Sequence, residues 1–361
     1  MILVKISLIL LLTLSAAGNT SAPPACRSQD KRDNAQRSEL QGGIGRDFEV
    51  IDTTAFTISD ETTFGIELEL TLGSNVTTAG IAAEIHTAGI SNIKDMTKQT
   101  RGWKRFYDGW KMVPDPSIYC KPLYEPDCSR FELVSPVLRG SSGLGEVAKI
   151  AHGLGSLQVE PNEKNGYHLH IDVSNLTLPQ LIKVCQNFVK YERIMDRFFP
   201  SSRRTGSKGS DRHFKSNRAS VAEGRRGVSN REIHDILTRS QSVAELAAAM
   251  NRGDRSRHYK LNLENLVSGR QPTIEFRQHV AVTSYRDISA WVCFCSNFVF
   301  NSASLRPPSP FASSTTLDER SDALFDYVIK DEELRTFYFL RIEQEAASAD
   351  GCEVRDETLI A

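Results

Sequence analysis

The chain has 361 residues, 40% of them hydrophobic and 25% charged, which is the composition of a globular protein with one large domain or two modest ones. Its 44 basic and 45 acidic residues leave a formal net charge of −1. This balance excludes a global electrostatic attraction to nucleic acid or to an anionic membrane surface.

The N-terminus has the layout of a removable secretion signal. Lys5 is followed by an apolar run over residues 6–14 and by small residues at 15–18. The run is shorter than the ~20 residues that span a bilayer. We therefore expect a signal peptide over residues 1–18 and a secreted or secretory-pathway protein, with an uncleaved signal anchor as the alternative. The polar segment after it predicts a flexible linker over residues 19–58.

A secreted chain would carry glycans and disulfides. Three Asn-x-Ser/Thr sequons are candidate glycan sites, at Asn19, Asn75 and Asn175. Of the seven cysteines, we pair Cys120 with Cys128, because they flank a short loop with two prolines and an oxidising compartment permits the bond. Three further cysteines lie in apolar helical patterns and are interpreted as buried hydrophobic side chains: Cys185, Cys293 and Cys295.

Regular structure is predicted from residue 62 onward. Strict alternation at 66–72 predicts a strand, and similar patterns predict strands at 110–113, 130–137, 167–173 and 273–279. Helices are predicted at 77–89, 143–157, 178–199, 242–250 and 285–300. A basic loop is expected at 201–226, and a C-terminal extension at 304–361 with one helix near 321–346 and a loose acidic end. Strands scattered among helices, without βαβ alternation, favour an α+β fold with a mainly antiparallel sheet and helices on one face.

Several of these strands place ionisable side chains on one face, since residues two apart in a strand point the same way. Glu67 and Glu69 form the first such pair, and two neighbouring carboxylates repel each other unless a cation lies between them. Hard divalent cations such as Mg²⁺ or Mn²⁺ suit this oxygen-rich setting. Glu132 adds one acid on the strand at 130–137. A solvated strand face is the alternative for each of these acids.

The two remaining polar strands carry other chemistry. His168, His170 and Asp172 alternate along one strand, and imidazoles can bind metal, move protons or donate to a phosphate. Glu275, Arg277 and His279 are expected to share one face of another, where the fork of an arginine could hold phosphate oxygens. A plain cross-strand salt bridge is the alternative. Taken together, the strands predict a sheet with one functional, ionisable face.

These residues resemble the amidoligase family, within the glutamine synthetase and glutamate–cysteine ligase superfamily. Six segments carry the resemblance in the family's order between residues 62 and 300: Phe64–Glu69, Trp110–Ser117, Glu132–Pro136, Gly166–His170, Tyr259–Leu263, and Thr273–Arg277 with His279. The resemblance implies a glutamine synthetase-like catalytic domain at 59–303, with a curved antiparallel sheet and helices packed behind it. ATP and Mg²⁺ (or Mn²⁺) would lie in the concavity.

The reaction that the resemblance implies is the joining of a carboxylate to an amine. The carboxylate would attack the γ-phosphate of ATP to give an acyl phosphate, and the amine would then displace phosphate. By the same resemblance, metal ligands would be Glu67, Glu69, Glu132, Glu275 and His170. Catalytic residues would be Glu67, Glu69, His168, His170 and Arg277. Nucleotide contacts would come from Arg277, Arg203, Arg204 and Asn262, and substrate or structural roles from Asp115, Ser117 and Asn262.

The expected partners are therefore a small-molecule or peptide carboxylate and an amine, with no nucleic acid and no stable membrane span. Two alternatives predict different behaviour. A catalytically inactive binding protein on the same fold would bind nucleotide or peptide without releasing phosphate. A metal-dependent amide or phosphoester hydrolase would turn over without ATP.

Overall fold

The computed structural model describes residues 56–72, 76–98, 108–120, 128–157, 159, 164–207, 210–253, 257–312 and 314–349. The chain divides into residues 1–50 and a second unit, 51–361, which contains every described residue. The expected signal peptide, nearly all of the linker and the loose C-terminal end lie outside the described residues, as do the sequons at Asn19 and Asn75.

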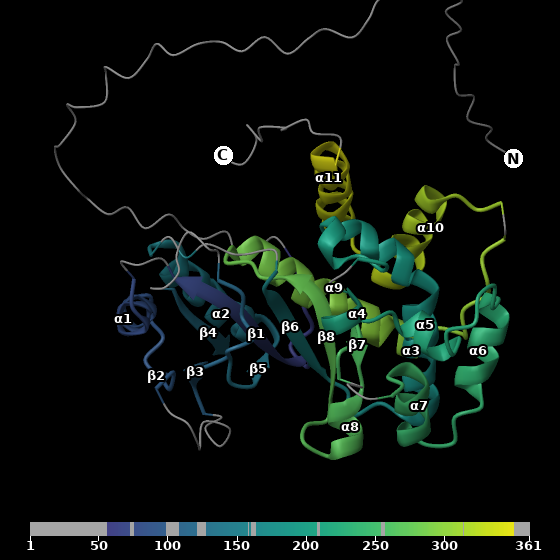
Figure 1. The fold of residues 1–361 in the computed structure, drawn as a ribbon, viewed down its shortest axis with the longest axis horizontal. Coiled ribbons are helices and arrows are strands. Elements are labelled where there is room, and N and C mark those ends of the chain that lie inside the picture. Colours follow the sequence, from purple (N-terminus) through teal and green to yellow (C-terminus); the bar gives the residue numbers. More distant parts are fainter. Residues whose placement is uncertain are drawn as a thin grey trace, which may run out of the picture. The chain divides into compact units, whose positions relative to one another are not determined.

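One open sheet of eight strands organises the second unit (Figure 1). Its strands run in the order β2 (Ile93–Asp95), β3 (Trp110–Val113), β4 (Ser129–Val134), β1 (Thr63–Leu72), β6 (Gly166–Asp172), β8 (Thr273–Val280) and β7 (Leu261–Asn262), while β5 (Leu138–Arg139) pairs with β1. Every pairing is antiparallel except that of β2 with β3. The predicted α+β class, with its mainly antiparallel sheet, is confirmed.

Helices pack around this sheet, and four of them begin within one residue of the predicted positions 77, 178, 242 and 285. The helices are α1 (Thr78–Thr87), α2 (Gly140–Gly155), α3 (Leu178–Met195), α4 (Ser210–His213), α5 (Asn217–Val221), α6 (Asn230–Thr238), α7 (Val243–Met250), α8 (Glu264–Ser268), α9 (Tyr285–Ser304), α10 (Leu317–Leu324) and α11 (Glu332–Ala349). At the start of α3, Thr177 and Gln180 form a capping box. Within the part of the chain that the structure describes, no helix combines the length and the apolar character that crossing a membrane requires.

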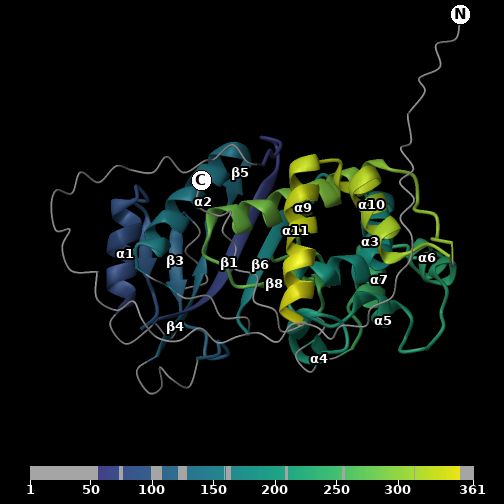
Figure 2. The ribbon, with the colours of Figure 1, turned by 90° about the horizontal axis from the view of Figure 1, so that it is seen from above.

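The alternation in β1 separates the two faces of the sheet as predicted. Its apolar side chains, such as Leu68 and Leu70, are fully buried, whereas the glutamates between them keep partial exposure. Helices α2 and α9 lie across the apolar face (Figure 2). On this side Trp291 of α9 packs edge-on against Phe276 of β8, with 6.0 Å between ring centroids. These two helices therefore leave the acidic face of the sheet uncovered.

Two expectations from the sequence are wrong in detail. The basic loop at 201–226 contains short helices, because Ser216 accepts a hydrogen bond from the amide of Ala219 and so caps α5. The single helix at 321–346 is two helices, α10 and α11, separated by a π-helical turn and by Lys330 in the left-handed region (φ 57°). Asp331 then accepts from the amide of Leu334, which starts a new helix at this point.

The expectations for the described cysteines are confirmed. Cys120 and Cys128 form a disulfide, with 6.2 Å between their Cα atoms. Cys185, Cys293 and Cys295 are free and buried among apolar side chains.

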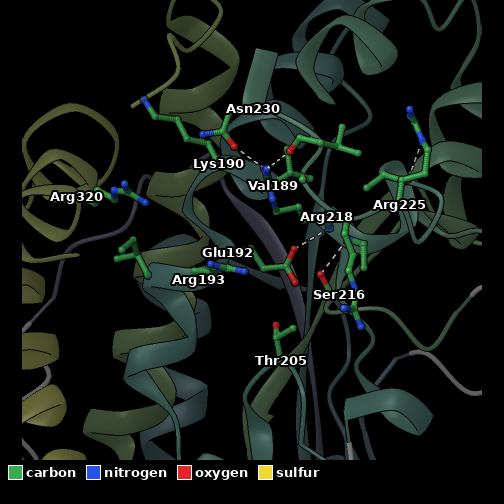
Figure 3. A pocket seen from close by; sticks show the side chains of 16 residues that line it. Val189, Lys190, Glu192, Arg193, Thr205, Ser216, Arg218, Arg225, Asn230 and Arg320 are labelled. Carbon is green, nitrogen blue, oxygen red and sulfur yellow. Dashed lines mark hydrogen bonds between the residues drawn. The ribbon is translucent and has the colours of Figure 1, made fainter. Parts of the chain in front are cut away.

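A cavity of about 520 Å³ lies between α3 and the segment that carries α5 and the start of α6 (Figure 3). None of the acidic residues expected to bind metal lines it.

Candidate active site

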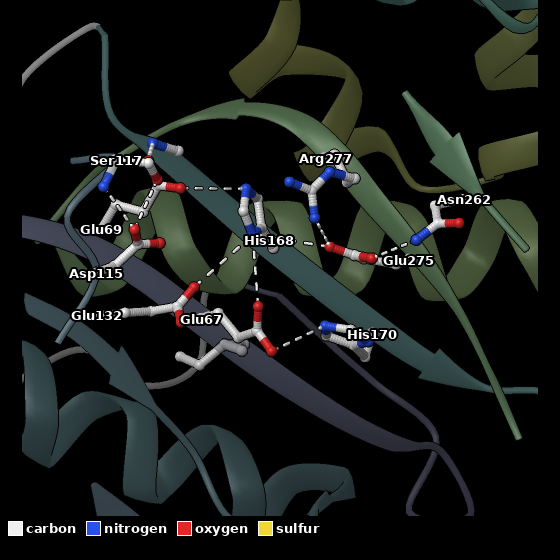
Figure 4. Close-up of polar contacts among 12 residues, drawn as sticks. Glu67, Glu69, Asp115, Ser117, Glu132, His168, His170, Asn262, Glu275 and Arg277 are labelled. Carbon is white, nitrogen blue, oxygen red and sulfur yellow. Dashed lines mark hydrogen bonds and ion pairs between the residues drawn. The ribbon is translucent and has the colours of Figure 1, made fainter. Parts of the chain in front are cut away.

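Polar side chains from four neighbouring strands converge on the face of the sheet that the long helices leave open (Figure 4). The strand register explains the convergence. Glu69 of β1 lies directly opposite Glu132 of β4, and Glu67 lies opposite His168 of β6. On the other side of β6, His170 lies opposite a glutamate of β8, Glu275. Directly opposed residues in a sheet have neighbouring side chains, so the register alone gathers acids and imidazoles.

His168 occupies the centre of this group. Its Nδ1 lies 3.4 Å from Glu67 Oε2 and 3.7 Å from Glu275 Oε1, and its Nε2 lies 3.7 Å from Glu69 Oε1. Glu132 Oε1 is 4.0 Å from Nδ1. One imidazole thus borders all four glutamates that were expected to bind metal.

The second histidine and the arginine extend the group along β6 and β8. His170 Nε2 lies 3.3 Å from Glu67 Oε1. Arg277 donates to Glu275 Oε1, while Asn262 donates to the other oxygen of the same carboxylate at 2.7 Å. The Nε atom of Arg277 is buried and makes no hydrogen bond within the described part of the chain. This N–H group can therefore donate to an additional anionic oxygen without displacing the contact to Glu275.

Burial and mutual repulsion set the charges of the glutamates. Burial raises the pKa of Glu132 well above its ordinary range, and the neighbouring carboxylates of Glu67, Glu69 and Asp115 raise it further. Burial also acts to raise the pKa of Glu67, but the attraction and hydrogen bonds of His170 and His168 outweigh it, so that this pKa lies well below its ordinary range. The cluster therefore holds more carboxylates than it can keep ionised by itself.

The donor set fits a hard divalent cation. Three groups of side chains each bring their ligand atoms within 4.8 Å of one another: Glu67, Glu132 and His168; Glu67, His170 and Glu275; and Glu69, Asp115 and Glu132. The groups share Glu67 and Glu132 and are rich in carboxylate oxygen, the ligand type of Mg²⁺ and Mn²⁺. A bound cation would also relieve the repulsion that raises the pKa of Glu132.

Asp115 joins the cluster through the turn after β3. Its Oδ1 accepts hydrogen bonds from the amide and the hydroxyl of Ser117, both at 2.7 Å, which fixes the carboxylate beside Glu69 and Glu132. Glu69 is held from the other side by the amide of Gly166 at 2.5 Å. Ser117 therefore orients an acidic side chain, which is the structural role considered for it.

The structure places three of the sequence candidates elsewhere. Asp172 accepts from the amide of Ser174 at 2.8 Å and so stabilises the turn after β6. His279, expected beside Arg277, points into the core because the pairing of β8 with β6 shifts register between Phe276 and His279. Arg204 donates to the carbonyl of Phe199 and lies 3.6 Å from Glu345 on α11.

The shift in β8 is a β-bulge. Two steps along β6, from Tyr167 to Leu169, match three along β8, from His279 to Phe276. The extra residue reverses the alternation, so that the ring of His279 packs edge-on against Phe199 and Tyr167 at 5.1 and 5.2 Å. Burial there lowers the pKa of His279 to about 3, which keeps it neutral.

Arg203 contacts the strand end that borders the cluster. Its guanidinium is buried, donates to the carbonyl of Asn165 and lies over the ring of Phe214, 4.8 Å from the ring centroid. Asn165 precedes Gly166, whose amide holds Glu69. Arg203 thus lies close enough to support the strand end that positions a carboxylate of the cluster.

Lys260 belongs to one of the segments that carry the family resemblance, but its ammonium points away from the cluster. It is fully buried, donates to Asp196 and to Thr205 Oγ1 (2.6 Å), and lies 3.4 Å from Glu192. Gln278 donates to the same aspartate and to the carbonyl of Arg203. This network fixes the segment that carries Arg203 against β8.

Two residues of the site were missed by the sequence reasoning. Lys111 of β3 is buried beside Glu67 and Glu132; burial lowers its pKa, and the two carboxylates partly restore it. His213 of α4 is close enough to Glu69 and Arg277 for both charges to act on its pKa. The alternation in β3 could have identified Lys111, whereas nothing in the basic segment distinguishes His213.

The comparisons with known proteins address the same part of the chain. A comparison with curated proteins found no match. A family model described as "putative amidoligase enzyme" matches residues 60–299, which contain every member of the cluster and two-thirds of the chain. The chain therefore belongs to the amidoligase family, and a ligase-type enzyme is the functional class that this membership supports.

Proposed function

We propose that the protein is an ATP- and Mg²⁺-dependent (or Mn²⁺-dependent) carboxylate–amine ligase on a glutamine synthetase-like fold. The observation that carries the proposal is the convergence of five carboxylates, two histidines and one arginine on one sheet face, inside the segment that matches the family. In the proposed reaction, a substrate carboxylate attacks the γ-phosphorus of ATP and ADP leaves. The amine then attacks the acyl carbon, phosphate leaves and the nitrogen loses a proton.

The carboxylates of the cluster would hold the cations, which supply neutralising charge to the phosphate oxygens. The ligands that we propose are Glu67, Glu69, Glu132, Glu275 and His170, together with Asp115, whose carboxylate lies near those of Glu69 and Glu132. The guanidinium of Arg277 supports a second part of the proposal. Because its Nε is buried and lacks a hydrogen bond in the described residues, it can donate to the phosphoryl group that is transferred.

His170 and Asn262 keep this arrangement in place. Burial lowers the pKa of His170, but the carboxylates of Glu67 and Glu275 more than compensate, so this pKa lies above its ordinary value. A partly protonated imidazole there stabilises the paired acids while no cation is bound. Asn262 donates to Glu275 and thereby leaves the other oxygen of that carboxylate for Arg277. We assign Asn262 this orienting role rather than a direct contact to nucleotide.

The test is phosphate release from the purified protein with ATP and Mg²⁺, with and without a pool of amino acids, peptides and polyamines. Release that depends on the acceptor pool supports a ligase. Folded, metal-bound protein that releases no phosphate under any condition would favour a binding protein. Loss of an amide without ATP would favour a hydrolase.

Two variants connect this activity to the cluster. Glu67→Gln removes the charge of the glutamate shared by two of the candidate metal groups, and Arg277→Ala removes the proposed phosphate donor. Both should lower turnover by at least ~100-fold, the effect of losing one preorganised electrostatic contact. Glu343→Gln on the exposed face of α11 is the matched control and should retain full activity. Full activity in both site variants would eliminate the site as described.

The location of this activity is proposed from the N-terminal sequence. The layout of residues 1–18 predicts entry into the secretory pathway, and the disulfide between Cys120 and Cys128 supports an oxidising compartment. The sequon at Asn175 lies in an exposed turn and is accessible for a glycan. An N-terminal sequence of the secreted protein that begins at Met1 would contradict cleavage.

A further inference from the structure

The 520 Å³ cavity between α3 and the α5–α6 segment is strongly basic. Six of its sixteen lining residues are cations: Lys190, Arg193, Arg218, Arg225, Arg226 and Arg320. Its single acid is Glu192. Figure 3 shows basic side chains from α3, from the α5 region and from α10 arranged around this space. In a chain with a net charge of −1, such a concentration of one sign is a local feature and not an overall trend.

Glu192 offsets only part of this charge, because its carboxylate also faces the buried ammonium of Lys260. It is buried beside Lys260, 3.4 Å from the ammonium, and it accepts a hydrogen bond from the amide of Arg218 at 2.8 Å. With six cations and one acid among its lining residues, the cavity keeps a surplus of positive charge.

Several of these cations have unused hydrogen-bonding capacity within the described residues. Arg193 and Arg226 form no hydrogen bond or ion pair there, although both line the cavity and are exposed. The Nε of Arg320 is buried without a hydrogen-bond partner. A buried donor that stays unpaired is destabilising, so a ligand that accepts a hydrogen bond from it would bind more tightly.

Burial makes two of these cations costly to keep charged. Burial lowers the pKa of Lys190 to about 8. Burial lowers the pKa of Arg218 as well, while the carboxylate of Glu192 raises it and the nearby charge of Arg193 lowers it. Both shifts indicate positive charges that are poorly solvated, and an anion between them would raise both pKa values.

The walls between the cations are apolar, and they include Val189, Ile194, Ala222 and Val228. A volume of about 520 Å³ is within the range of small-molecule sites. We propose that this cavity is a second binding site, for a phosphate-bearing small molecule whose phosphate pairs with the arginines and whose organic part contacts the apolar walls. Planar guanidinium groups bind phosphate oxygens in bidentate fashion. Several of them around one space match the double negative charge of a phosphate better than they match the single charge of a carboxylate ligand.

The experiment is calorimetric titration of the full chain with inorganic pyrophosphate in the presence of EDTA. EDTA removes divalent cations, so that the acidic cluster cannot retain the probe through a metal. We expect saturable binding to one site. Arg193→Gln combined with Arg226→Gln should weaken it roughly tenfold or more, the effect of losing charged hydrogen bonds. Both side chains are exposed and lack hydrogen bonds in the described residues, so the variant should fold, which thermal unfolding can verify.

Two matched variants and one further probe make the outcome decisive. Arg239→Gln removes an exposed arginine at the end of α6 that does not line the cavity, and Glu67→Gln alters the acidic cluster. Unchanged pyrophosphate binding in both supports the proposed site. No saturable binding, or an equal loss with Arg239→Gln, would overturn it. Citrate that binds as tightly as pyrophosphate would overturn the assignment to phosphate.

Discussion

Replacing Lys260 by methionine tests whether the buried ion pair behind the site stabilises the fold. The side chain is fully buried and contacts two carboxylates, those of Asp196 and Glu192. Methionine fills a similar volume, so the main effect is to leave two buried acids without their cation. Asp196 would keep hydrogen bonds from Gln278 and from the amide of Thr205, whereas Glu192 would keep only the amide of Arg218 among the described residues.

The expected loss in the free energy of unfolding is about 3–5 kcal/mol, the cost of removing one partner of a buried pair. With an m-value of about 3 kcal/mol/M, the urea midpoint should fall by roughly 1–2 M. Lys149→Met, at an exposed position of α2, is the control and should leave the midpoint unchanged. Adding Asp196→Asn to Lys260→Met should recover part of the loss, because one of the unpaired acids is then neutral.

A loss below about 1 kcal/mol, the range of exposed ion pairs, would refute the argument that this lysine is a buried cation. Such a result would mean that water reaches Asp196 and Glu192. The same variant also separates structure from chemistry. At temperatures where it remains folded, it should retain measurable ligase activity, because the ammonium of Lys260 contacts no member of the acidic cluster.

Three further predictions concern charge and cross-linking. The pKa of His279 is about 3 in the fold and 6.5 ordinarily, so the unfolded state takes up a proton at a pH where the folded state does not. The free energy of unfolding should therefore fall by about 2 kcal/mol from pH 7 to pH 5. If urea titrations of His279→Phe show the same dependence on pH, the burial of a neutral His279 is not its cause. Because the pKa of Glu132 is raised, the metal-free protein should lose stability as pH rises above the ordinary carboxyl range. Mn²⁺ should therefore raise the melting temperature more at pH 8 than at pH 6, and Glu132→Gln should abolish the difference. Replacing Cys120 and Cys128 by serine should cost about 2.5 kcal/mol from loop entropy, and an unchanged urea midpoint would argue against a stabilising disulfide.

The sheet and most of its active face were predictable because period-two alternation is a local property. The spacing of Glu67 and Glu69 requires a shared face whatever surrounds the strand, and the same holds for His168 and His170. The cross-strand register was not predictable, because it depends on how strands far apart in the sequence pair. The family resemblance supplied the expectation that these strands meet, and the structure supplied the contacts.

Three expectations about local structure are wrong because a feature at one residue redirects the chain after it. One extra residue in β8 moves His279 to the core, and one left-handed residue, Lys330, divides a continuous helical pattern. In the basic segment, Ser216 starts a short helix in a sequence whose charge suggests a loop. The nucleotide contact expected of Arg204 stays a prediction; this side chain lies 3.6 Å from Glu345 on α11, a partner more than a hundred residues away that no local pattern could indicate.

The bulge in β8 has a consequence for how this strand tolerates mutation. It allows one strand to present Arg277 to the acidic cluster, to use Gln278 to hold Asp196 and the carbonyl of Arg203, and to anchor His279 among aromatic rings. These three roles depend on the number of residues between Phe276 and Val280 more than on any one side chain. Over this stretch, deleting a single residue should therefore be more damaging than replacing one, because the number of residues matters more than their identity.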